Sequence, residues 1–137
     1  MNRRKSREQA FILLFESSFE LQSKEEIIAL AQSIRKEEIS NFSKELFEGT
    51  IAKKDDIDHS IEQHLQGWKK DRLSKIVLSI LRLAIFEMLY YNDTPVGVSI
   101  NEAVELAKKY GTKEDASYIN GILSSINKGN NSSEDII

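Results

Sequence analysis

The stretch IVLSILRLAIFEMLYY, residues 76–91, is the feature that most restricts how this chain folds. Its apolar residues recur at helical spacing, and further apolar residues fill most of the opposite side. A helix that is apolar nearly all round is buried among other helices. The stretch is shorter than a membrane span and contains Arg82 and Glu87, which argues against a transmembrane segment. We therefore expect a helix over about 71–91 in the middle of a helical bundle.

The rest of the chain contains few residues that break helices. One proline and six glycines occur in 137 residues, and no segment alternates apolar and polar residues long enough for a strand. Hydrophobic residues make up 40% and charged residues 30%, a balance that excludes a disordered chain. The sequence predicts one all-α domain over 1–137, a compact bundle of six to seven helices arranged as two small helical subdomains.

Helix start signals divide the first half of the chain, about 1–66. The first predicted helix covers about 3–21. Three more are predicted to begin after Ser23, at about Ser40, and at Asp55 or Asp56. Ser23 with Glu26 three residues later is a capping box, in which each side chain accepts a hydrogen bond from the other residue's backbone. The sequence QGW at 66–68 interrupts the helical pattern and is the expected hinge between the two halves.

The second half, about 67–128, has its clearest signals after Pro95, which ends the central helix because the residue before a proline avoids the α region. Its predicted helices cover about 71–91, 99–111 and 114–128, and a frayed tail follows at 129–137. Ser99 and Glu102 predict a second capping box, with Val98 and Ala103 as its hydrophobic staple and Gly111 at the helix end. Gly121 inside the last helix predicts a closely approaching neighbour there.

Catalytic and metal-binding patterns are absent from the sequence. There is no cysteine, and the only two histidines, His59 and His64, are five residues apart, which does not place them on one helix face. No phosphate-binding glycine loop, paired carboxylates or activated nucleophile is recognisable. We expect no enzyme activity, no metal and no cofactor. The basic start does not resemble a signal peptide, because its apolar run is short and no cleavage site follows, so a cytoplasmic protein is expected.

The start of the chain concentrates positive charge. Arg3, Arg4, Lys5 and Arg7 place four cations within residues 2–7 of a protein whose net charge is −3. Cations at a helix N-terminus oppose the helix dipole at a cost of about 0.3–1 kcal/mol each, so helix stability does not explain them. They are either a solvated helix end or a contact for nucleic-acid phosphates, and single-stranded RNA suits such a local patch better than duplex.

Arg82 and Glu87 are charged residues within the most apolar helix. One interpretation, which the sequence favours, places both on a single solvated or partner-facing stripe. The other makes them a buried polar anchor that holds the two halves together.

Three stretches together resemble one family. They are RRKSREQAFILLF near the start, LSILRLAIFEMLYYNDTPVGVSINEAVELAKKYG at 78–111, and ASYINGILSSI at 116–126. In this order they closely resemble the bacterial transcription antitermination factors of the NusB family. The resemblance implies an all-α fold of two small bundles without catalysis or cofactor. It also implies pairing with NusE, a small-subunit ribosomal protein, and binding of the pair to boxA in nascent RNA. This complex helps RNA polymerase read through terminators, particularly in rRNA operons.

The resemblance also implies site residues. The residues carried over for RNA binding are Arg3, Arg4, Lys5, Arg7, Phe15 and Tyr118, and those for partner binding are Val77, Arg82, Glu87, Asp93 and Asn101. Phe15 stands where the family usually has a tyrosine, so a ring remains without its hydroxyl. Two other functions stay open: an adaptor that binds only protein, and an RNA-binding factor in ribosome assembly. A homodimer also stays open, because family members occur as monomers and as homodimers.

Overall fold

The computed structural model describes residues 1–65, 70–91 and 93–135, and within these ranges it contains helices and no strand. The helices are α1 (Arg3–Ser17), α2 (Lys24–Ser33), α3 (Asn41–Ala52), α4 (Lys54–Glu62), the 3₁₀ helix η1 (Lys70–Arg72), α5 (Lys75–Leu89), α6 (Val96–Tyr110) and α7 (Lys113–Asp135). The predicted all-α fold is therefore confirmed. No helix of the described residues is long and apolar enough to cross a membrane.

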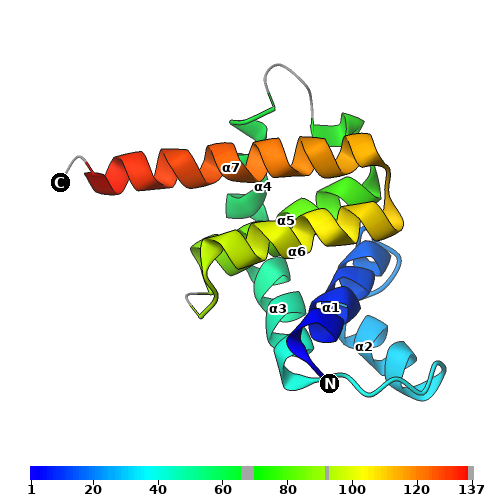
Figure 1. Ribbon diagram of the computed structural model, residues 1–137. Coiled ribbons are helices and arrows are strands. Elements are labelled where there is room, and N and C mark those ends of the chain that lie inside the picture. Colours follow the sequence, from blue (N-terminus) through cyan, green and yellow to red (C-terminus); the bar gives the residue numbers. More distant parts are fainter. Residues whose placement is uncertain (66–69, 92, 136–137) are drawn as a thin grey trace.

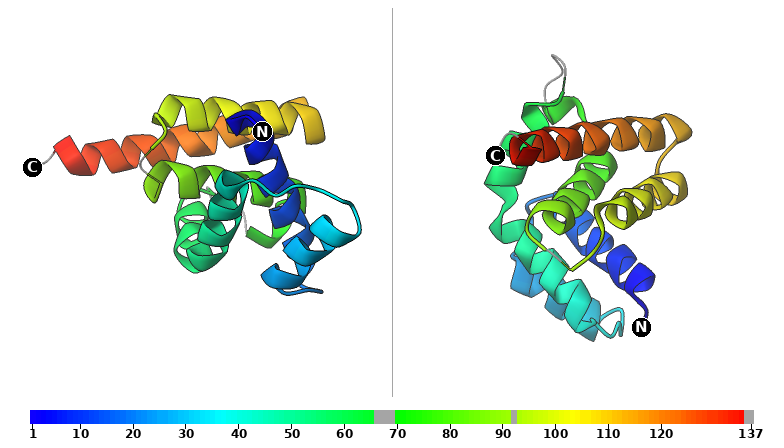
Figure 2. Two further views of the ribbon diagram at one scale, coloured as in Figure 1. Left: turned by 90° about the horizontal axis from the view of Figure 1, so that it is seen from below. Right: turned by 60° about the vertical axis from the view of Figure 1, so that its left-hand side comes forward.

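Helix α5 occupies the middle of the molecule, as its sequence predicts. It packs against α1, α3, α4, α6 and α7, and ten of its fifteen residues are buried. In Figures 1 and 2, α6 and α7 lie side by side on one side of α5, while α1, α2 and α3 lie together on the other. One continuous apolar core includes residues of both halves. The predicted hinge at 66–68 lies outside the described residues.

The local signals of the first half are partly confirmed. Ser23 and Glu26 form the predicted capping box, and the Ser40 side chain caps α3. Helix α1 ends at Ser17, earlier than expected, and Glu20 then adopts a left-handed backbone with φ 57° that turns the chain. The predicted aspartate cap of α4 is wrong, because α4 follows α3 with only Lys53 between them.

The start of α6 differs from the prediction. The helix begins at Val96, directly after Pro95, so Ser99 lies inside the helix and is 2% exposed, not at its cap. The predicted capping box and its staple are therefore wrong, because proline itself favours a helix start with its fixed φ.

Helix α7 also starts and ends differently. Thr112 and Asp115 cap it reciprocally, each backbone N–H donating to the other's side chain at 3.0 Å. Gly111 is required by close approach, since a Cβ there would lie 2.6 Å from Asp115 Oδ2. A Cβ on Gly121 would meet nothing within 4 Å, so the expected close neighbour is absent from the described part of the chain. The helix continues to Asp135, where a frayed tail was expected.

Candidate nucleic-acid interface

The first turn of α1 presents three exposed cations. Asn2 caps the helix, and its Oδ1 accepts a hydrogen bond from the backbone N–H of Lys5 at 2.9 Å. This cap fixes the orientation of the turn that carries Arg3, Arg4 and Lys5, which are all exposed. Because the helix N-terminus is itself partly positive, the turn combines side-chain cations with the dipole in one place. An anion is the ligand that such a turn favours.

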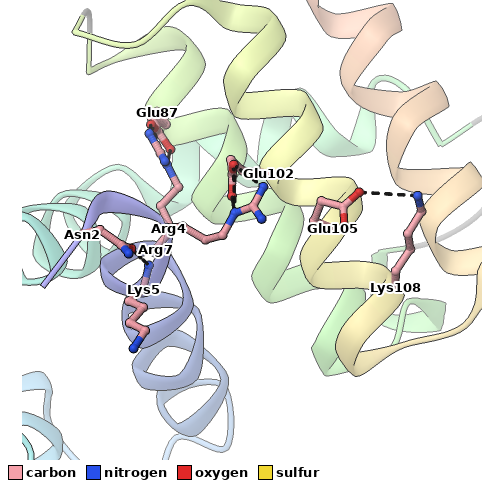
Figure 3. Close-up of polar contacts among 8 residues, drawn as sticks. All are labelled: Asn2, Arg4, Lys5, Arg7, Glu87, Glu102, Glu105 and Lys108. Atoms are coloured by element: carbon pink, nitrogen blue, oxygen red, sulfur yellow. Dashed lines mark hydrogen bonds and ion pairs between the residues drawn. The ribbon is translucent and has the colours of Figure 1, made fainter.

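Two of these cations contact acids from the second half. Arg4 donates through Nε and Nη2 to the carboxylate of Glu102 on α6, at 3.2 and 3.1 Å. Arg3 donates to Asp93 at 2.9 Å, and its guanidinium lies 4.3 Å from the ring centre of Phe42 on α3. Figure 3 shows Arg4 reaching toward Glu102 while Lys5 extends away from that pair. Both pairs are open to solvent on the arginine side, so they exchange readily with other anions.

A groove of about 350 Å³ runs between α1 and α6 beside this turn. Its lining residues are Arg4, Lys5, Glu8, Glu102, Glu105, Leu106 and Lys109. Lys109 pairs with Glu8 at 2.5 Å across the groove, and the hydrogen bond and charge of Glu8 raise the pKa of Lys109. The lining of the groove therefore contains three cations and three acids. A phosphate chain that binds here must displace carboxylates from the cations.

Arg7 has a different environment. It is 6% exposed, and it donates to both carboxylate oxygens of Glu87 on α5, at 2.7–3.0 Å. Figure 3 shows this pair between α1 and α5. Each side chain is enclosed by the other's helix, so the structure presents neither Arg7 nor Glu87 on an open surface, and their expected contacts with phosphates and a partner stay predictions. Glu87 is the buried polar anchor that joins the two halves.

Arg82 is likewise not on a solvated stripe. It donates through Nε and Nη2 to Asp58 on α4, at 2.8 and 2.9 Å, and Lys70 contacts the same carboxylate at 3.1 Å. Burial acts to raise the pKa of Asp58, but the hydrogen bonds and charges of Arg82 and Lys70 outweigh it, so this pKa lies below its usual value. The preferred interpretation of Arg82 and Glu87 as one exposed stripe is therefore wrong.

The remaining expected partner residues separate into two groups. Val77 is 4% exposed and packs in the core, and its expected partner contact stays a prediction. Asp93 and Asn101 are exposed, and they lie before and within the first turns of α6. Arg82 has a side chain that is 11% exposed, so Asp93 and Asn101 are the two exposed residues of the five.

The two aromatic residues expected at the RNA site lie elsewhere. Phe15 is twelve residues after Arg3 along α1, a helical distance of about 18 Å, and its ring contacts Phe19 edge-on at 5.2 Å. Tyr118 lines a separate groove with other residues of α7 and with His64 and Leu65, which follow α4. The structure does not bring either ring to the basic turn. Their part in RNA binding stays a prediction.

Sequence reasoning missed three residues at this interface. Phe42 lies beside Arg3, and its ring centre is 5.6 Å from that of Tyr91. Glu102 is predicted as part of a helix cap and is instead the partner of Arg4, and Lys109, which pairs with Glu8, is not singled out by its sequence. The sequence signal for these residues is a charged cluster on α6, formed by Glu102, Glu105, Lys108 and Lys109. Only the fold shows that this helix faces α1. The described residues contain no cluster of acids and histidines that would hold a metal ion.

The fold and this charged groove define a small all-α protein built around one central apolar helix. The sequence profile of the NusB family matches residues 4–128, and the chain belongs to this family. A transcription antitermination protein NusB from Ruminiclostridium cellulolyticum is 42% identical over 132 residues, covering 94% of this chain and 90% of that protein. Its counterpart from Oceanobacillus iheyensis is 41% identical and covers 92% and 98%.

Solved structures of relatives have the same fold. T. maritima NusB superimposes with a TM-score of 0.82 at 33% identity, covering 93% of this chain and 92% of that one. A structure of the antitermination factors NusB and NusE in complex with dsRNA gives a TM-score of 0.83 at 25% identity, covering 93% and 96%.

Proposed function

We propose that this protein binds boxA-type RNA together with a NusE-type ribosomal protein and acts in transcription antitermination, particularly of rRNA operons. The observation that carries the proposal is the exposed basic turn of Arg3, Arg4 and Lys5 on an otherwise acidic protein of the NusB family. The relative solved with NusE and RNA supports it. The protein works by binding alone, without catalysis or a cofactor, and its place is the cytoplasm, where nascent RNA is made.

The RNA backbone follows the groove between α1 and α6. Arg3, Arg4 and Lys5 take phosphates, and the Phe42 ring beside Arg3 offers a face on which a base stacks. Three neutralised phosphates give a log–log salt slope of about −2 for a single strand. Four accessible cations would give a slope near −3, but Arg7 is buried and does not contribute.

The partner protein meets the neighbouring surface at the start of α6. Asp93 and Asn101 are its accessible polar contacts, and Arg3 links this surface to the RNA site through its bond with Asp93. RNA and partner therefore bind side by side, so that each adds to the other's contact area.

The test is a fluorescence-anisotropy titration of a boxA-like RNA, single-stranded and duplex, with and without the NusE-type partner. The variant Arg4→Gln/Lys5→Gln removes two cations of the basic turn. The matched control Lys36→Gln/Lys128→Gln removes two exposed lysines that contact no acid among the described residues.

We expect the first variant to weaken RNA binding at least tenfold and to reduce the salt slope by about 1.4, with the control unchanged. Equal loss in both variants would show non-specific attraction. Unchanged RNA binding in the first variant would show that the RNA face lies elsewhere, first around Tyr118. No RNA binding by the original protein, with intact partner binding, would instead favour the adaptor that binds only protein.

A further inference from the structure

A second groove lies at the opposite end of α1 from the basic turn. It has a volume of about 350 Å³ and is enclosed by the end of α1, the start of α2, the end of α3, the start of α4, and α5. Its lining residues are Leu14, Ser17, Ser18, Glu20, Gln22, Lys24, Thr50, Ile51, Lys54, Ser79 and Arg82. None of these residues belongs to the RNA groove, so the two sites are separate.

Ser79 supplies the first sign that this groove holds a ligand. Its side chain on α5 is 1% exposed, and its Oγ has no hydrogen-bond partner among the described residues. A buried hydroxyl without a partner costs free energy unless another group satisfies it. Because Ser79 lines the groove, an acceptor bound there is the group that its hydroxyl can reach.

Charge supplies the second sign. Lys24, Lys54 and Arg82 line the groove, and Glu20 is its one acid. Neither lysine forms an ion pair with another described residue. Arg82 holds Asp58 with Nε and Nη2, which leaves Nη1 for a second acceptor. This concentration of donors is unusual in a chain with net charge −3. The three cations come from three helices, α2, α4 and α5, and such a set suits an anion with several oxygens.

Two apolar side chains complete the groove. Leu14 and Ile51 line it beside the polar residues, together with the amide of Gln22. Inorganic phosphate alone would leave this apolar surface uncovered, whereas an organic group attached to the phosphate would cover it. The volume lies at the lower end of the range for small-molecule sites.

We propose that this groove binds a phosphorylated small molecule of nucleoside monophosphate size. The phosphate accepts from Lys24, Lys54, Arg82 Nη1 and the Ser79 hydroxyl, and the organic part packs against Leu14 and Ile51. The proposal does not rest on RNA binding, because it uses other residues at the other end of α1.

The test is an NMR titration of the ¹⁵N-labelled full-length protein with AMP, adenosine and inorganic phosphate in turn. We expect AMP to shift the amides around Ser17, Lys54 and Ser79, inorganic phosphate to shift them with at least tenfold weaker affinity, and adenosine to leave them unchanged. Equal affinity for AMP and inorganic phosphate would overturn the assignment of an organic ligand. Shifts confined to residues 2–8 would overturn the site, since AMP would then occupy only the RNA groove.

Variants separate binding from folding. Lys24→Gln/Lys54→Gln should weaken AMP binding at least tenfold, while the control Lys36→Gln/Lys128→Gln binds as the original protein does. Ser79→Ala should weaken AMP binding about three- to tenfold without lowering the melting temperature, because it removes a buried hydroxyl that has no partner. Unchanged AMP affinity in Ser79→Ala would overturn the part assigned to this hydroxyl.

Discussion

Arg4 and Arg7 are three residues apart on α1, and each forms a bidentate pair with a glutamate, yet the two pairs do different work. Arg7 and Glu87 are 6% and 1% exposed, whereas the side chain of Arg4 is 66% exposed beside Glu102. Neither member of a buried pair can bind another ion instead, because the remaining charge would then lie unpaired in the core. The exposed pair is weak and exchangeable. The helix face therefore decides whether an arginine of this basic start holds the fold or is free to bind a ligand.

The largest effect should come from breaking the buried pair. Glu87→Gln keeps the shape of the side chain but leaves Arg7 as an uncompensated buried charge. We expect a loss of about 3–5 kcal/mol in the free energy of unfolding, measured by urea denaturation. As a control, Arg7→Met/Glu87→Leu should recover most of this loss, because no charge remains in the core. A loss below about 1 kcal/mol in Glu87→Gln would show that water reaches the pair.

The pair of Arg82 and Asp58, whose side chains are 11% and 8% exposed, should lie between the two extremes. Asp58→Asn removes the charge that Arg82 and Lys70 share, and we expect a loss of about 1.5–3 kcal/mol at pH 7. Because the pKa of Asp58 is lowered in the folded protein, its stabilisation is complete above about pH 4 and is lost as the pH falls further. The variant should therefore lose less stability than the original protein between about pH 4 and pH 2. Parallel curves of stability against pH would contradict the pairing.

The acid that pairs with Arg4 should affect binding more than stability. Glu102→Gln frees Arg4, and we expect RNA affinity to rise about two- to fivefold in the anisotropy titration. Glu105→Gln is the matched control, since Glu105 lies in the same groove but pairs with Lys108 and not with α1. An equal gain in both variants would indicate a general effect of net charge and not release of Arg4.

The smallest effect on folding should come from Arg4→Gln. Its partner Glu102 keeps access to water, so the midpoint of urea denaturation should not change measurably, although RNA binding weakens. A clear drop in the midpoint would show that the exposed pair also supports the fold.

The sequence predicted best those elements whose cause is local. The central helix follows from its apolar periodicity, and the cap of α2 from Ser23 and Glu26. The start of α6 was mispredicted because Pro95 and Ser99 are both good helix starters, and only the tertiary packing buries Ser99.

The positive charge of the site could be predicted from the sequence, but the acids that pair with its cations could not. The basic turn could be recognised from residues 3–5, but nothing local distinguishes Arg7, whose neighbour Glu87 is 80 residues away. Asp58 left a weak signal, since it shares the inward face of Ile61 and Leu65 and an acid on such a face needs a partner. Which cation supplies that partner depends on how α4 packs against α5.

The Arg7–Glu87 pair also has a consequence for synthesis on the ribosome. Arg7 is translated 80 residues before its partner, so the first four helices are made before its counterion exists. A nascent chain that ends before α5 also lacks the helix that encloses Arg7, so the guanidinium stays in water until α5 arrives. The buried pair therefore forms only when α5 packs against α1, and this contact joins the two halves late in synthesis.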